Sequence, residues 1–238
     1  PPTVASMSAD ASPNPAADIY RGESGRRYHE GKRALDRRAL EAITRLRAEK
    51  FQPHVKPTDV VFELGVGAGW NLARLICARR LGSDAAEFLA ETVQALGIEF
   101  VANPASVPSG TADVVICHHT LEHLLEPAAA LRELGRILKP NGRLILHVPW
   151  ERERRYANHS PDEPNHHLHT WNAQTLGNFV PLCGFRLESV PTRRYGYDRF
   201  AANQAARLRF GQGGFRLLRR LMVTLRPLRE VELLARKA

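Results

Sequence analysis

The sequence lacks the features of a membrane-spanning or disulfide-bonded protein. None of its apolar runs approaches the roughly 20 residues that a helix needs to cross a bilayer. Its three cysteines, Cys77, Cys117 and Cys183, are odd in number, lie far apart and stand in apolar stretches. This usage argues against a disulfide framework or a zinc site and favours reduced, buried thiols. We therefore expect a cytoplasmic protein, with contact to a membrane surface left open.

Residues 1–17 lack the apolar segment of a signal peptide. They are rich in proline, alanine, serine and asparagine, which predicts a disordered leader. Residues 18–238 are long enough for one domain with an appendage. The hydrophobic share of 43% and the charged share of 25% are ordinary for a globular protein.

Acidic residues are scarce at the C-terminal end. From Arg193 to Ala238 the sequence holds 12 Lys or Arg against 3 Asp or Glu, a net charge of +9, which equals the formal charge of the whole chain. The other 192 residues carry 22 charges of each sign. Any attraction to an acidic partner therefore belongs to residues 193–238 alone.

Helices and short apolar strands alternate along most of the chain. The patterns predict strands at 59–64, near 84, 98–102, 113–117, 143–148, 185–190 and 231–235. They predict helices at 28–51, 71–78, 85–96, 127–138, 173–182 and twice within 200–225, where residues 211–214 break the last two. Alternation of this kind predicts an α/β domain with a mostly parallel sheet and helices on both faces. We expect its core at 55–192, a basic helical insertion at 200–227 and a final strand at 229–237.

A glycine-rich turn follows the first predicted strand, in the segment Glu63-Leu-Gly-Val-Gly-Ala-Gly69. Such a turn lets the backbone approach a ligand closely. A dinucleotide fingerprint would read G-x-G-x-x-G, but here the third glycine comes one residue early, and Trp70 stands where it would be. Glu63 suits a cation better than a phosphate. S-adenosylmethionine carries an ammonium and a sulfonium and no phosphate, so this cofactor fits the turn better than a nicotinamide dinucleotide.

Three segments in order resemble the class I S-adenosylmethionine-dependent methyltransferases: the glycine turn 63–69, Leu121-Glu122-His123 and the turn Leu138-Lys-Pro-Asn-Gly142. The resemblance covers about 90 residues, from Asp59 to Val148. It implies a Rossmann-like sheet of seven strands in the order 3-2-1-4-5-7-6. It also implies that Gly65, Gly67 and Gly69 line the cofactor and that Glu63 holds the methionine amine.

The same resemblance places further residues at the cofactor. Asp84 would bind the ribose hydroxyls, with Glu87 as the alternative, and an N-cap role for Asp84 is the competing interpretation. Asn103 and Pro104 would meet the adenine, since an asparagine can both donate and accept. Tyr28, with Arg27 beside it, would cap the cofactor from the N-terminal side.

Three histidines follow the fourth strand, at positions 118, 119 and 123. In this fold the segment faces the transferable methyl, so His118, His119 and His123 are the candidates for a base that removes a proton from the acceptor. His118 would also contact the cofactor. Strand alternation turns one of His118 and His119 toward the pocket, and we favour His119.

His119-x-x-Glu122-His123 also resembles a metal-binding segment of ubiquinone-type and small-RNA methyltransferases. The latter add a later histidine, for which His166, His167 or His169 would serve. A histidine replaces the first glutamate of that pattern, which disfavours Mg²⁺ because it prefers oxygen ligands. We therefore predict no metal, with an ordering role for Glu122 and His123.

Candidates for the substrate side are the aromatic and imidazole side chains of Trp70, Trp150, His167 and His169. A solvated loop with one packed aromatic is the competing interpretation for the last two. The segment after the fourth strand has neither the D/N-P-P-Y nor the Pro-Cys of DNA methyltransferases. The sequence thus predicts methyl transfer to an oxygen or nitrogen of a small molecule, with a sugar, polyketide-like or lipid-linked acceptor favoured.

Alternatives remain open at this stage. The chain would otherwise be an RNA (2′-O or tRNA) methyltransferase, or a non-catalytic fold that binds the cofactor. The basic C-terminal helices would serve in internal packing or a homodimer, or else at a membrane surface, and nucleic acid is the least favoured partner.

Overall fold

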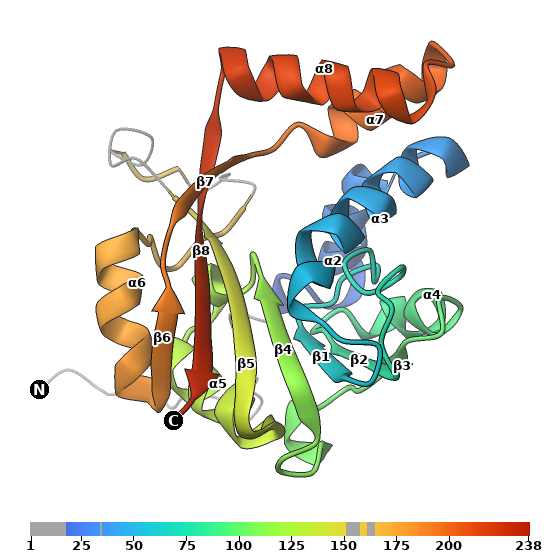
Figure 1. The fold of residues 1–238 in the computed structure, drawn as a ribbon. Helices are drawn as coiled ribbons and strands as arrows, with labels where there is room; N and C mark the ends of the chain where they lie inside the picture. Colours follow the sequence, from blue (N-terminus) through green and yellow to red (C-terminus); the bar gives the residue numbers. More distant parts are fainter. Residues whose placement is uncertain (1–17, 34, 151–157, 161–164) are drawn as a thin grey trace, which may run out of the picture.

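The computed structural model describes residues 18–33, 35–150, 158–160 and 165–238. Its centre is one twisted sheet (Figure 1). The strands are β1 (Val60–Leu64), β2 (Arg79–Ser83), β3 (Glu99–Phe100), β4 (Ala112–His118), β5 (Leu138–Pro149), β6 (Phe185–Ser189), β7 (Thr192–Tyr195) and β8 (Leu228–Lys237). The predicted leader, 1–17, lies outside the described residues.

The strand order is β3-β2-β1-β4-β5-β8-β6, with β7 paired to β8. β1 to β5 are parallel, and β8 runs antiparallel to β5, β6 and β7. The predicted order of seven strands is confirmed, because β8 takes the place of the expected last strand. β7 is an additional strand that was not predicted. Three of its four side chains are exposed and two of them are arginines, so it shows no apolar pattern, as is common for edge strands.

The helices are α2 (Gly22–Arg33), α3 (Arg37–Phe51), α4 (Ala90–Gln94), α5 (Pro127–Ile137), α6 (Ala173–Phe179), α7 (Asp198–Arg207) and α8 (Gly211–Leu225). α5 and α6 cover one face of the sheet through Leu131, Leu134 and Leu176. The other face packs against the end of α3 and against α4, with Phe51 and Val93 in the core. Helices therefore cover both faces, as predicted.

Two helix predictions are wrong. The expected helix 28–51 is two helices, and Asp36 caps the second by accepting a hydrogen bond from the backbone N–H of Ala39 at 2.7 Å. The expected helix 71–78 is absent, and the segment forms turns instead. Only residues 65–78 join β1 to β2, and the glycine turn takes the first five. The nine residues that remain, 70–78, bring the chain back to the start of β2 in turns.

α7, α8 and the link to β8 form a basic arm, residues 198–228, at the edge of the sheet where β4 ends (Figure 1). The arm packs on α3 through small and aromatic side chains, with Ala201, Ala205 and Phe215 against Ala39 and Ile43. The helices separate at 208–210, not at 211–214 as predicted, and Gly211 begins α8. Within the described ranges, no helix has the length and hydropathy to cross a membrane.

Candidate functional site

A cavity of about 360 Å³ opens at the carboxyl ends of β1, β2 and β4. This is the edge where ligands of parallel sheets bind. The lining comes from the glycine turn, the ends of three strands and the N-terminal segment, and it comprises Tyr20, Arg21, His29, Leu64, Gly65, Gly67, Ser83, Asp84, Ala85, Glu87, Ala102, Pro104, His119, Thr120, His123 and Leu124.

The three glycines of the turn all have positive φ, at 76° for Gly65, 52° for Gly67 and 78° for Gly69. A Cβ on Gly65 would meet the side chain of Thr120 at 2.0 Å, and one on Gly69 would meet Ile98 at 2.9 Å. A Cβ on Gly67 would have no atom within 4 Å. Gly65 and Gly67 line the cavity, whereas Gly69 lets the turn pack on the core and is not a lining residue.

Asp84 directly follows β2 and lines the cavity, as does Glu87. Its two carboxylate oxygens accept backbone N–H groups, Oδ2 from Gly67 at 2.7 Å and Oδ1 from Ala86 at 2.8 Å. These bonds fix the carboxylate beside the glycine turn, and each oxygen keeps lone pairs for further donors. Asp84 and Glu87 thus both remain candidates for the ribose.

Glu63 lies in β1 and is completely buried. Burial raises the pKa of its carboxyl to about 8, although Asn71 donates a hydrogen bond to Oε1. Oε2 has no hydrogen-bond partner within the part of the chain that the structure describes. A buried oxygen in this state is rare and costly, and an ammonium group would satisfy it. Although Glu63 does not itself line the cavity, the chemistry of this position fits the amine of S-adenosylmethionine.

The remaining cofactor candidates differ in position. Pro104 lines the cavity, while Asn103 does not, and its Oδ1 accepts the backbone N–H of Ala105 at 3.0 Å. The side chain of Tyr28 lies outside the described structure. Tyr20 lines the cavity, and its hydroxyl lies 2.9 Å from Nδ1 of His123. Tyr20 was not predicted as a site residue. The expectation that an N-terminal tyrosine caps the cofactor applies to it as well as to Tyr28.

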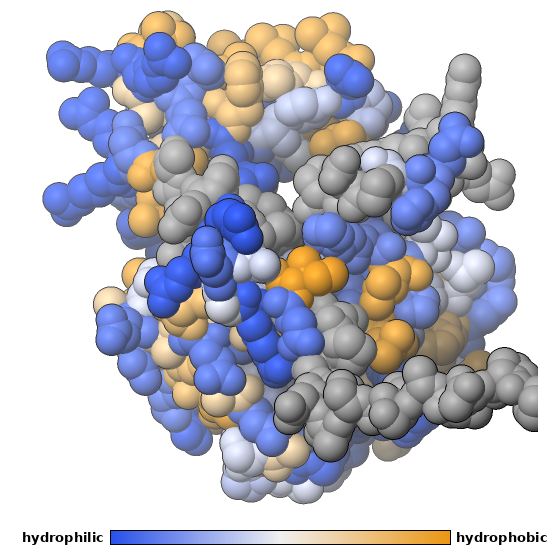
Figure 2. All heavy atoms as spheres, turned by 180° about the vertical axis from the view of Figure 1, so that it is seen from behind, coloured by the Kyte–Doolittle hydropathy of each residue, from blue (hydrophilic) through white to orange (hydrophobic). Residues whose placement is uncertain are grey.

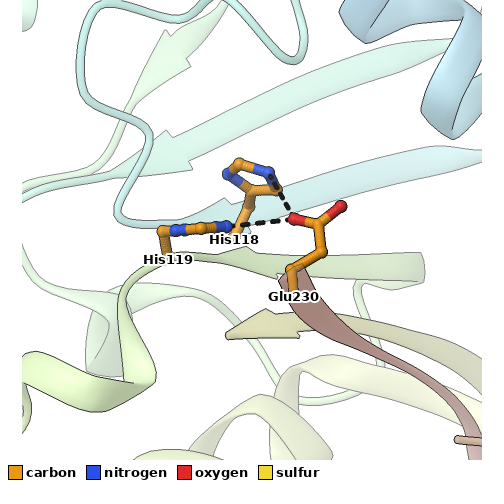
Figure 3. A group of neighbouring side chains, drawn as sticks. All are labelled: His118, His119 and Glu230. Carbon is orange, nitrogen blue, oxygen red and sulfur yellow. Dashed lines mark hydrogen bonds and ion pairs between the residues drawn. The ribbon is translucent and has the colours of Figure 1, made fainter. Parts of the chain in front are cut away.

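His119 follows β4 with a left-handed backbone, at φ 52°. Its side chain lines the cavity, and its Nε2 lies 3.0 Å from Oε2 of Glu230 on β8 (Figure 3). The ring also lies 5.1 Å from that of Tyr195 on β7, centroid to centroid. Neither Glu230 nor Tyr195 was predicted, because both come from the C-terminal strands.

The charges of this pair follow from burial and neighbours. Burial lowers the pKa of His119, whereas the hydrogen bond and the charge of Glu230 raise it. The effect of burial is the larger one, so the pKa lies below its ordinary value. Burial alone would raise the pKa of Glu230, but the hydrogen bond from His119, the nearby His147 ring and the charge of Lys50 hold that pKa far below its ordinary value. At neutral pH Glu230 is therefore ionised and His119 neutral. The Nε2–H of His119 then donates to Glu230, and Nδ1 is left with the lone pair.

His118 points away from the cavity, toward α3. Its Nε2 lies 2.9 Å from the guanidinium of Arg47 and 3.2 Å from Nζ of Lys50, and it is not a lining residue. Burial and these cations lower its pKa well below the ordinary value. Lys50 also donates to Glu230 at 2.6 Å. His118 thus belongs to a buried network behind the cavity, and His119 is the histidine that faces it.

The loop after β5 approaches the segment 121–123. The backbone carbonyl of Glu122 accepts the N–H groups of Leu168 at 2.9 Å and His169 at 3.1 Å. The rings of His123 and His167 lie 4.8 Å apart, centroid to centroid. His167 is thereby next to a lining residue, whereas the ring of His169 lies 5.8 Å from that of Trp171.

The two remaining substrate candidates do not line the cavity. Trp150 forms a bridge with Trp171, and its ring lies 5.5 Å from the guanidinium of Arg229. Trp70 packs against the core between α3 and the arm. Roles for these residues on the substrate side stay predictions.

Two groups of described residues have ligand atoms within 4.8 Å of one another: His118, His119 and Glu230, and Glu122, His123 and His167. The set considered from the sequence, His119, Glu122 and His123, is split between them. Lys50 and Arg47 lie against the first group, and their charges oppose a metal cation there. That no metal is used stays a prediction.

Comparisons with known proteins agree with this geometry. Residues 30–190 match the model of a methyltransferase domain family. The chain is 30% identical over 146 residues to the malonyl-[acyl-carrier protein] O-methyltransferase of Hahella chejuensis, a match that covers 56% of this chain and 52% of that protein. It is 32% identical over 99 residues to a ubiquinone biosynthesis O-methyltransferase of Xanthomonas oryzae, covering 36% and 41%. The chain thus spans about half the length of these relatives or less.

Solved structures share the fold. A SAM-dependent methyltransferase from Thermotoga maritima has a TM-score of 0.58 at 19% identity, covering 77% of this chain and 87% of its own. The [4+2]-cyclase SpnF has a TM-score of 0.58 at 21% identity, covering 86% and 83%. These identities show the fold alone. With the family match over most of the chain, they confirm the predicted family and its cofactor: the chain belongs to the S-adenosylmethionine-dependent methyltransferases with a Rossmann-like fold.

Proposed function

We propose that the protein transfers a methyl group from S-adenosylmethionine to a hydroxyl or amine of a small molecule. The cofactor would supply a methyl group bonded to a positively charged sulfur. An acceptor atom with a lone pair would bond to the methyl carbon as the sulfur–methyl bond breaks, and S-adenosylhomocysteine would leave. Gly65 and Gly67 would leave room for the cofactor, Glu63 would pair with its amine, and Asp84, with Glu87 as the alternative, would accept hydrogen bonds from its ribose hydroxyls.

The observation that carries this proposal is the His119–Glu230 pair at the cavity. Nδ1 of the neutral His119 takes the proton of the acceptor hydroxyl or amine as the acceptor atom forms its bond to the methyl carbon. Glu230 holds the ring through Nε2 and stabilises the imidazolium that results. A histidine oriented by a buried carboxylate acts in the same way in serine hydrolases. The proton afterwards leaves His119 to solvent.

Two curated relatives are named as O-methyltransferases, which supports an oxygen acceptor here. Within that class we favour a sugar, polyketide-like or lipid-linked hydroxyl. A carboxylate acceptor would need no base, so the buried pair argues for a group that must lose a proton. The same pair argues against a non-catalytic cofactor-binding fold, and RNA methylation gains no support from the residues that line the cavity.

The test is methyl transfer from labelled S-adenosylmethionine to a panel of small hydroxylated and amino acceptors, with Gly67→Arg as the inactive control. Gly67 has positive φ and open space before it, so an arginine strains the turn and occupies the cavity. We expect label transfer by the wild type and none by the variant. Equal transfer by both would contradict the proposed cofactor site.

A further inference from the structure

The arm presents a row of exposed leucines that the fold does not use. On α8, Leu217, Leu221 and Leu225 are 61%, 51% and 83% exposed. They stand four residues apart and therefore lie along one side of the helix. Phe215 is buried against α3 and α7, and Leu218 packs beside it. The helix thus has one apolar side that packs on the protein and another that is largely exposed among the described residues.

The arm carries further exposed apolar side chains at both ends of α8. Leu208 and Phe210 lie at the turn between α7 and α8, and Leu228 lies where the arm joins β8. Figure 2 shows hydrophobic side chains along the top edge of the molecule, where α8 lies, beside hydrophilic ones. Contiguous apolar surface on the outside of a protein marks an interaction site.

The charge of the arm points to the partner. Residues 199–229 contain eight arginines and no aspartate or glutamate. Arg219 pairs with Asp198 and Arg216 with Glu49. The exposed Arg199, Arg207, Arg209, Arg220 and Arg226 have no ion pair among the described residues. The arm is therefore apolar and basic at once, which suits a partner that offers both negative charges and apolar groups.

A second copy of the chain is the less favoured occupant. In a two-fold dimer the same patch meets itself, so arginines of one arm would face arginines of the other without acidic residues between them. A membrane surface with anionic lipids instead offers acyl chains to the leucines and phosphates to the arginines. With 15 residues, α8 is about 22 Å long, too short to span a bilayer but suited to lie along it.

We propose that the arm docks the protein on an anionic membrane surface, with Leu217, Leu221 and Leu225 of α8 inserted among the lipids and the arginines against the headgroups. The docking surface does not depend on the proposed chemistry. The arm nevertheless lies next to the proposed site. Asp198 of the arm pairs with Arg47 at 3.0 Å, and Glu230 follows the arm after two residues. A docked arm holds the catalytic edge of the sheet close to the membrane.

The test is flotation of the purified protein with vesicles of phosphatidylcholine alone or mixed with phosphatidylglycerol. We expect the wild type to float with the mixed vesicles, less so at high salt, and not with phosphatidylcholine alone. Replacing Leu217, Leu221 and Leu225 by serine should weaken the apparent affinity by on the order of tenfold or more. The matched control is the double variant Leu182→Ser with Ile76→Ser. These two aliphatic side chains lie outside the arm and are 82% and 65% exposed.

Light scattering and circular dichroism complete the experiment. The leucine variant should keep the wild-type fold and mass, since none of the three side chains is buried. Flotation that the leucine variant retains would overturn the proposal, as would no flotation of the folded wild type. A wild-type dimer that the leucine variant abolishes would assign the surface to a second copy instead.

Discussion

Nε2 of His119 lies 3.0 Å from Oε2 of Glu230, although 111 positions separate the two residues in the chain. β4 ends at His118 and β8 begins at Leu228, and β5 lies between them in the sheet. The antiparallel last strand therefore brings its first residues to the edge where the parallel strands end. The proposed base and its partner therefore come from the middle and the C-terminal end of the chain.

Glu230→Gln should lower the rate of methyl transfer by roughly 10²–10⁴-fold, the usual contribution of a general base, because an amide does not stabilise the imidazolium. Cofactor affinity should not change, since Glu230 does not line the cavity. The measurements are turnover and calorimetric affinity, with Glu232→Gln on the same strand as the control. A variant with full activity would remove Glu230 from the mechanism.

His119→Ala should lower turnover to a similar degree and leave cofactor binding intact. His118→Ala offers the comparison, because His118 bonds to Arg47 and Lys50 behind the cavity. We expect its main effect on the melting temperature. If His118→Ala abolished turnover in a stable protein while His119→Ala did not, the assignment of the two histidines would be reversed.

Asp84→Ala should weaken cofactor affinity by about 1–3 kcal/mol, because hydrogen bonds to a charged group are lost. The variant also frees the backbone N–H groups of Gly67 and Ala86, so Glu87→Ala is measured beside it. Calorimetric titration decides between them. An unchanged affinity of Asp84→Ala with a weakened Glu87→Ala would move the ribose role to Glu87.

The buried Glu63 predicts a pH dependence of stability. Its pKa is raised from 4.5 to about 8, so between these values the folded protein binds more protons than the unfolded chain. The free energy of unfolding therefore falls as pH rises through this window. Glu63→Gln removes that fall. Chemical denaturation from pH 5 to pH 8 compares the two proteins, and parallel curves would contradict the raised pKa.

Much of the fold was predictable because its signals are local. The glycine turn 63–69 and the segment 121–123 are short contiguous patterns, and the cavity lies where they and Asp84 come together. Alternating strands and helices predicted a mostly parallel sheet with helices on both faces, and the strand order came from the resemblance to the class I methyltransferases.

The part that could not be predicted depends on distant or unpatterned residues. Glu230 is the partner of His119, and Lys50 is a partner of His118. These two residues lie 180 positions apart, and neither stands in a recognisable sequence pattern. The turns at 71–78 were not predicted either, because the segment has a helical pattern in the sequence. β7 carries arginines on an edge, where no apolar alternation marks a strand.

Calorimetric titration of S-adenosylhomocysteine into the wild type and Gly67→Arg tests the central claim most directly, that the cavity beside the glycine turn receives this nucleoside. The account predicts one site per chain in the wild type and no measurable heat of binding in the variant. Folded wild-type protein that binds neither this compound nor S-adenosylmethionine would contradict it.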